Sequence, residues 1–234
     1  MYRYFSKLLL LLFFSFTSVQ AQNEQLSDSL QYKDKYGLRV GIDISKALRT
    51  FLEDGYSGLE LVGDYRVSEK FYAAAELGNE KLTFEGDNIG TTANGSYIKI
   101  GADYNAYDNW QDMQNIIFVG LRYGFSTFSQ TLDWYRVYSS SAYYGPDVRM
   151  VNNEVSGLNA SWIEMMIGIK VELFNNLFLS ANVQLKRRIA QKTPDNFDNL
   201  AIPGFGRTYD ESMFGAGYGY TISYLIPLYK KNRH

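Results

Sequence analysis

Few residues in this chain could take part in catalysis, and their types exclude several classes of enzyme. The chain has no cysteine, and its single histidine is His234, the last residue. Thiol nucleophiles, histidine-based proton transfer and Cys/His metal sites are therefore not expected. Carboxylates remain, because Glu164 and Glu172 share one face of an alternating segment with Lys170. Paired carboxylates can catalyse hydrolysis, but structural ion pairs explain these three residues more simply, so we expect no catalysis.

No other motif indicates a cofactor, a metal or a nucleic acid. The sequence has no glycine-rich phosphate loop ahead of a helix, no GxSxG elbow and no metal-ligand spacing. Without Arg3 and Lys7, which lie in an expected leader, 21 basic residues stand against 25 acidic ones. A net charge of −4 is too mild to indicate a nucleic-acid partner. We expect no cofactor.

Fourteen charged residues recur at alternate positions of extended segments, which places them on one face of each strand. Seven are basic and seven are acidic. An enclosed charge needs a partner, because an unpaired buried charge costs far more than a paired one. The set therefore predicts a structural, ion-paired interior. Its members are Arg39, Asp43, Glu60, Asp64, Arg66, Glu76, Lys99, Asp103, Arg122, Glu164, Lys170, Glu172, Lys186 and Arg188.

The elements that must position these charges are eight segments in which apolar and polar residues alternate. Such alternation is typical of strands with two unlike faces. Most segments run for about 9–13 residues, which exceeds the ~5–6 of soluble sheets and suits the ~9–11 of tilted membrane strands. The segments span 38–44, 59–67, 71–78, 98–105, 117–125, 162–173, 177–186 and 214–224.

The connections between these segments alternate in length. Short links at 68–70 and 175–176 and an intermediate one at 108–114 contrast with long links at 45–56, 80–95, 128–158 and 189–213. Outer-membrane barrels have short periplasmic turns and long external loops. The predicted fold is all-β: an eight-stranded antiparallel up-and-down transmembrane β-barrel with a polar, charge-paired lumen, which side chains alone can fill.

Aromatic residues near the strand ends fit the interface girdles of such a barrel. Amphipathic rings settle at the level of the lipid headgroups. The candidates are Tyr36, Tyr56, Phe71, Tyr104, Phe125, Phe174 and Tyr224.

The two ends of the chain have the features of an exported protein. Residues 1–21 read as a signal peptide, with Arg3 and Lys7 ahead of an apolar run at 8–16 and a cleavage site near Ala21. Residues 22–35 are expected to be a flexible periplasmic lead-in, 36–228 the barrel and 229–234 a basic periplasmic tail. The predicted location is the outer membrane.

Several stretches resemble known proteins. They are YGLRVGIDISK (36–46), GSYIKIGADYN (95–105), WIEMMIGIKVELFNN (162–176), NFDNLAIPGFGRTYD (196–210) and GYGYTISYLIPLYKK (217–231). Together they resemble small eight-stranded outer-membrane barrels of gram-negative bacteria, and more specifically an uncharacterised family of short envelope barrels of unknown function. The resemblance implies a fold and a location, but no functional residues.

The two longest links concentrate side chains that are common in binding sites. Aromatic residues and arginine dominate binding hot spots, so the links are candidates for recognition outside the cell. The alternative is that these side chains fold over the barrel mouth and pack on each other. The candidates are Trp134, Tyr135, Tyr138, Tyr143, Tyr144, Phe197, Phe205 and Arg207.

The sequence leaves three functions open. The first is a non-enzymatic outer-membrane barrel with an envelope-structural or surface-recognition role. The second is a secreted soluble barrel that holds a small apolar ligand, because alternation alone does not say which face is inside. The third is a small pore. For the first, the expected partners are outer-membrane lipid, the barrel-assembly machinery and an unidentified external ligand or envelope protein.

Overall fold

The computed structural model describes residues 33–108, 114–137, 145, 147–209 and 211–232, which belong to one compact unit. The signal peptide predicted for residues 1–21 and its cleavage site lie outside the described residues. The elements are β1 (Lys33–Asp43), α2 (Ile44–Leu52), β2 (Tyr56–Arg66), β3 (Phe71–Glu85), β4 (Ile89–Asn105), β5 (Ile116–Val137), β6 (Asp147–Phe174), β7 (Leu177–Gln191), β8 (Ala201–Ile202), β9 (Gly206–Arg207) and β10 (Phe214–Asn232).

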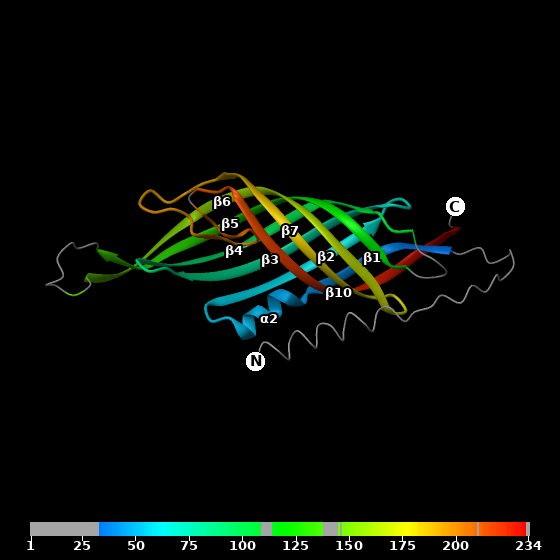
Figure 1. The fold of residues 1–234 in the computed structure, drawn as a ribbon, viewed down its shortest axis with the longest axis horizontal. Coiled ribbons are helices and arrows are strands. Elements are labelled where there is room, and N and C mark those ends of the chain that lie inside the picture. The colour runs from blue at the N-terminus through cyan, green and yellow to red at the C-terminus, as the bar shows by residue number, and fades with distance from the viewer. Residues whose placement is uncertain (1–32, 109–113, 138–144, 146, 210, 233–234) are drawn as a thin grey trace, which may run out of the picture. The chain divides into compact units, whose positions relative to one another are not determined.

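Eight of these strands form a closed barrel (Figure 1), in the order β1-β10-β7-β6-β5-β4-β3-β2. Strands β8 and β9 form a separate hairpin. All neighbouring barrel strands are antiparallel. The predicted eight-stranded antiparallel barrel is confirmed. We call the end with the links 67–70 and 175–176 the turn end, and the opposite end the hairpin end.

The outer face of the barrel is apolar at the level shared by all eight strands. Period-two alternation directs the predicted apolar faces outward and the charged faces into the lumen. A carrier for an apolar ligand would need the reverse arrangement. We call this outward surface the apolar belt; its exposed members include Val40, Leu61, Leu77, Ile100, Leu121, Ile167, Val183 and Ile222.

No helix in the described part of the chain is long and apolar enough to cross a membrane.

Two of the predicted long loops are strands in the structure. The alternation continues past the apolar belt, so β3 and β4 extend to a turn at 86–88, and β5 and β6 extend to Val137 and from Asp147. The predictions of loops at 80–95 and 128–158 are therefore wrong over most of their length. Both faces of these extensions carry polar residues, which hides the apolar period that identifies a strand.

The link at 45–56 is not simply a loop, because it contains α2. The Asp43 side chain caps the helix: its Oδ1 accepts from the backbone N of Ser45 at 2.8 Å and from the Ser45 hydroxyl at 2.6 Å. Leu48, Phe51 and Leu52 form an exposed apolar stripe on the helix. Asp43, which the sequence predicted as a member of the charged lumen set, is buried at the end of β1 and caps this helix.

The barrel also extends further at both chain ends than the sequence predicted. Lys33, Asp34 and Lys35 of β1 pair with residues 230–232 of β10, so the inner ends of the predicted lead-in and tail are strand. Two girdle candidates, Tyr36 and Tyr56, are buried, whereas the other five are exposed. Tyr36 lies beside a bulge of β1, where it stacks on Tyr229 with ring centroids 5.1 Å apart.

Candidate functional site at the hairpin end of the barrel

The middle of the lumen is built around Lys99 of β4. Its ammonium lies 3.2 Å from Glu60, 2.8 Å from Glu76 and 3.9 Å from Glu164. These carboxylates come from β2, β3 and β6, so one cation links four strands across the interior. Because the Lys99 side chain is only 1% exposed, these contacts replace its hydration.

Arg122 and Lys170 extend this cluster toward the turn end. Arg122 contacts Glu76 at 3.1 Å and Asp103 at 2.6 Å, and Lys170 contacts Asp103 at 3.1 Å and Asp64 at 2.8 Å. Each cation therefore shares a carboxylate with the next one along the lumen.

Two further pairs complete the chain of charges. Arg39 contacts Asp64 at 3.4 Å and lies over the Phe178 ring, and Lys186 lies 3.8 Å from Glu164. We call the continuous set the lumen network. It comprises ten of the fourteen charged residues expected in the lumen, namely Arg39, Glu60, Asp64, Glu76, Lys99, Asp103, Arg122, Glu164, Lys170 and Lys186.

The turn end is closed by two separate ion pairs. Arg66 contacts Asp34 at 2.8 Å, and Glu172 contacts Lys35 at 3.1 Å. Asp34 and Lys35 lie in the segment that the sequence assigned to a lead-in, so both partners were missed. Arg188, the last predicted lumen residue, is half-buried on β7, and its backbone N donates to the Met213 carbonyl at 2.8 Å.

The hairpin end is closed by an apolar cluster beneath β8 and β9. Phe205, in the tight turn between them, is 2% exposed and meets Trp162 edge-on with ring centroids 5.9 Å apart. Gly124 makes room for the indole, because a Cβ there would lie 2.2 Å from Trp162 Cε2. The cluster comprises Tyr97, Phe128, Leu158, Ala160, Trp162, Ile202 and Phe205.

The remaining recognition candidates lie in different environments. Arg207 is exposed and lies 4.4 Å above the Phe84 ring, whereas Phe197 is half-buried. Trp134 and Tyr135 are half-buried on the extension of β5. Tyr138, Tyr143 and Tyr144 lie outside the described residues. Phe205 packs inside the barrel mouth, so it is not an exposed recognition side chain.

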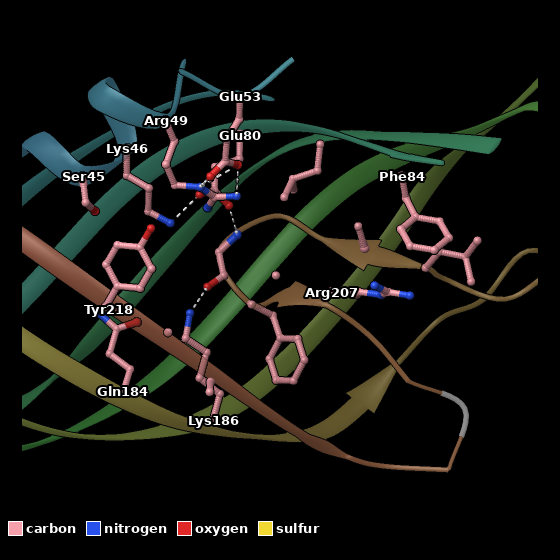
Figure 2. Close-up of a pocket in the computed structure, with 18 of the residues that line it drawn as sticks. Ser45, Lys46, Arg49, Glu53, Glu80, Phe84, Gln184, Lys186, Arg207 and Tyr218 are labelled. Atoms are coloured by element: carbon pink, nitrogen blue, oxygen red, sulfur yellow. Dashed lines mark hydrogen bonds and ion pairs between the residues drawn. The ribbon is translucent and has the colours of Figure 1, made fainter. Parts of the chain in front are cut away.

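A cavity of about 350 Å³ opens beside this cluster, between α2, the β8–β9 hairpin and β10 (Figure 2). We call it the mouth cavity. Four of its lining side chains are basic (Lys46, Arg49, Lys186 and Arg207) and two are acidic (Glu53 and Glu80). Its apolar and aromatic lining includes Leu82, Phe84, Leu200, Phe205, Ala216 and Tyr218.

Glu80 organises one wall of the mouth cavity. Its carboxylate pairs with Lys46, and it accepts from the Tyr56 hydroxyl at 2.7 Å and from the Gly204 backbone N at 2.7 Å. The Gly204 carbonyl in turn accepts from Lys186 Nζ at 2.8 Å. These bonds hold the β8–β9 hairpin to the barrel wall at a residue whose φ of +82° suits glycine.

The basic residues of α2 remain charged at neutral pH. Burial lowers the pKa of Lys46, but the carboxylates of Glu80 and Glu60 outweigh this effect, so the pKa is raised above its ordinary value. Arg49 pairs with Glu53 at 2.8 Å and lies 3.8 Å above the Tyr56 ring. The sequence missed Lys46, Arg49 and Glu80, because they fall in segments that were predicted to be loops.

No group of three or more metal-ligating side chains is present among the residues that the structure describes.

Residues 1–231 match the family described as Domain of unknown function (DUF6048). The chain belongs to this family. The resemblance of the sequence to an uncharacterised barrel family is thereby confirmed, and the strand order above is the fold of this DUF6048 member. No protein with a curated function matches it.

Two solved structures are similar to this DUF6048 member. One is Ail, the attachment invasion locus protein of Yersinia pestis, at 10% identity and a TM-score of 0.38, covering 84% of this chain and 99% of that one. The other is CarO2 of Acinetobacter baumannii, at 10% identity and a TM-score of 0.36, covering 83% and 99%.

Proposed function

We propose that this protein is a non-enzymatic integral outer-membrane barrel, which presents the extensions of β3–β6 outside the cell in an envelope-structural or surface-recognition role. The observation that carries the proposal is a boundary on the outer face. Leu77, Ile98 and Phe125 are cross-strand neighbours on β3, β4 and β5, and all three are exposed and apolar. A lipid-facing band ends where such residues end.

The next outward positions on the same strands are polar. Asn79, Ser96 and Thr127 are again cross-strand neighbours, and the Asn79 amide donates to the Ser96 hydroxyl at 3.0 Å. Further along, Thr92 donates to Asp133 at 2.8 Å. Hydrocarbon would strip these groups of water at a cost, so the extensions belong in the aqueous phase.

The interior argues against the pore. The void beside the lumen network, between Asp64, Arg122 and Lys170, is only about 40 Å³. A conducting path would have to displace side chains that are paired and buried, such as Lys99 and Glu164. A soluble carrier is disfavoured by the outward apolar belt, since exposed apolar surface of this extent marks a membrane or protein partner.

The rest of the proposal follows from the chain ends and the hairpin end. Residues 1–21 serve as a signal peptide cleaved near Ala21, and the assembly machinery of the outer membrane inserts the barrel among lipids. Arg207, Trp134 and Tyr135 are candidates for contacts with an external ligand or envelope protein. Catalysis is absent from the proposal, because the carboxylates of the lumen are committed to ion pairs.

Single cysteines test the location and orientation cleanly, because the chain has none of its own. Asn153→Cys lies on the exposed extension of β6, and Ser68→Cys lies at the turn end. We expect a membrane-impermeant maleimide to label Asn153→Cys on intact cells and Ser68→Cys only after the outer membrane is permeabilised. Equal labelling of both on intact cells, or recovery of the protein in a soluble fraction, would contradict the proposal.

A further inference from the structure

The barrel wall is incomplete at one place on the hairpin end. The pairing of β1 with β10 stops at Asp43, which pairs with Thr221, although β10 continues to Phe214. On its other side, β1 pairs with β2 as far as Leu61, and the five residues of β2 at 56–60 have no partner in β1. Among the described residues, positions 214–220 of β10 therefore have a strand partner on one side only, which is β7.

Helix α2 occupies this gap, and its polar contacts are mainly with β2. The Thr50 hydroxyl accepts from the Gly58 backbone N at 3.0 Å, which ties the helix to β2. Arg49 lies over the Tyr56 ring on the same strand. Toward β10, the Tyr220 backbone N donates to Asp43 Oδ1 at 3.4 Å, just before the helix begins. The edge of β10 beyond Tyr220 faces the helix without a strand ladder.

The two faces of α2 have opposite character. Leu48, Phe51 and Leu52 are exposed over 51%, 85% and 80% of their surface. Lys46 and Arg49 point toward the mouth cavity (Figure 2). A helix of this kind suits a membrane interface, with its apolar face in the acyl region and its cations near headgroups.

The mouth cavity lies directly behind this gap and has more cations than carboxylates. It is lined by Ala216, Gly217 and Tyr218 from the open edge of β10 and by Lys46 and Arg49 from α2. Lys46 and Arg49 already have carboxylate partners. The cavity's surplus of positive charge therefore comes from two other lining residues.

Arg207 and Lys186 supply this surplus. Arg207 is exposed and flanked by the rings of Phe84 and Tyr209, at 4.4 Å and 5.3 Å from their centroids. The two rings hold the guanidinium without neutralising it, so its donors suit a phosphate or carboxylate. Lys186 lies 3.8 Å from Glu164 and donates to a backbone carbonyl, so its charge is only partly offset.

We propose that the mouth cavity binds the anionic phosphate headgroup of a membrane lipid, whose acyl chains leave the barrel between α2 and β10. The cations of the cavity would hold the phosphate, and the apolar lining, with Leu82 and Ala216, would contact the first part of the chains. The ligand passes through the wall at the level where β1 no longer separates the lumen from the apolar belt. This inference rests on the proposed membrane location.

The test is lipid retention by the full mature chain, purified in dodecyl maltoside and measured by native mass spectrometry. Dioleoylphosphatidylglycerol is the anionic probe and dioleoylphosphatidylcholine the zwitterionic one. We expect one tightly held phosphatidylglycerol per barrel, with about tenfold preference over phosphatidylcholine, the size of one charge-assisted contact. Equal retention of the two lipids would overturn the proposal.

Two variants and a matched control locate the site. Arg207→Gln removes the flanked cation, and Gly217→Val places side-chain atoms where a Cβ already meets the ends of Gln184 and Lys186 at 2.7–3.3 Å. Both are expected to abolish the preference, whereas Arg149→Gln, which removes an exposed arginine on β6, should retain it. An unchanged preference in both cavity variants would overturn the site.

Two further readouts separate the remaining outcomes. Glycerophosphoglycerol carries the same phosphodiester headgroup without acyl chains. Full competition by it at matched concentration would show that the site binds a free anion, and this would overturn the proposal of a lipid ligand. A gel shift on boiling reports the closed barrel in every sample. If the native protein shows no shift, the proposed function fails; if it shifts but does not prefer phosphatidylglycerol, only this inference fails.

Discussion

The lumen network and the mouth cavity are built from the same residue types, but their charges are matched differently. In the network, Lys99, Arg122 and Lys170 each lie within 3.2 Å of two carboxylates, and the adjoining void is about 40 Å³. In the cavity, four basic residues, of which Lys186 also belongs to the network, face two acidic ones around about 350 Å³. Matched charge without space supports the barrel, whereas surplus charge with space can hold a ligand.

The strongest test of this comparison removes the central cation of the network. Lys99→Met leaves Glu60, Glu76 and Glu164 without it, and an uncompensated buried charge costs about 3–5 kcal/mol. We expect the free energy of unfolding, measured by urea titration in lipid vesicles, to fall by about that amount. Lys81→Met, at an exposed position of β3, is the control and should have little effect. A small decrease in the free energy of unfolding of Lys99→Met would show that the network does not stabilise the barrel.

The second test removes the ring that closes the mouth. Phe205→Ala deletes a side chain buried against Trp162, a change that costs about 3 kcal/mol in a packed core. The loss is expected to loosen the β8–β9 hairpin rather than the barrel. Limited proteolysis should therefore cut within 199–209 while the heat-dependent gel shift persists. Loss of the gel shift would instead show that the apolar cluster stabilises the barrel itself.

A third test concerns the cap of α2. Asp43→Ala removes the side chain that accepts from Ser45, and loss of such a cap costs about 1 kcal/mol. Amide hydrogen exchange in 44–52 should accelerate without a change in the strands. Asp43→Asn retains an acceptor and serves as the control. Equal exchange in Asp43→Ala and the parent would show that contacts with β2 alone hold the helix.

The smallest effect is expected on the β5–β6 extension. Arg149 pairs with Asp147 at 3.1 Å, but both side chains are more than half exposed. Exposed ion pairs contribute about 0–1 kcal/mol, so Arg149→Gln should leave the urea midpoint within about 0.5 kcal/mol of the parent. A loss as large as that of Lys99→Met would remove the distinction between the enclosed network and the water-exposed extension.

The sequence predicted the regions where one face of a strand is apolar. Ile163, Met165 and Ile167 alternate with Glu164 and Met166. Once the strands close into a barrel, this pattern determines which residues face outward and which face the lumen. Ten of the charged residues that this alternation selects form the lumen network. The alternation could not pair them, because Lys99 meets carboxylates from three other strands, and pairing across a lumen depends on tilt and register.

The missed elements have two different causes. The extensions carry polar residues on both faces, as at Asn79 and Thr92, so no hydrophobic period identifies them as strands. The helix was detectable: Ile44, Leu48, Phe51 and Leu52 have helical spacing after a capping aspartate. The mouth cavity depends on both missed elements, because Glu80 lies on an extension and Lys46 on the helix. Its position could not be inferred until they were known.

The seam between the first and last strands has a consequence for the rate of folding. Lys33 pairs with Asn232, and Lys35 pairs with Lys230, although β1 and β10 lie at opposite ends of the chain. Contacts this distant in sequence form late and slowly, because the loop-closure entropy must be lost before any contact compensates for it. We therefore expect seam closure to limit the folding rate. Until it happens, the edges of β1 and β10 are both open to other strands, so a stalled chain would be prone to aggregate.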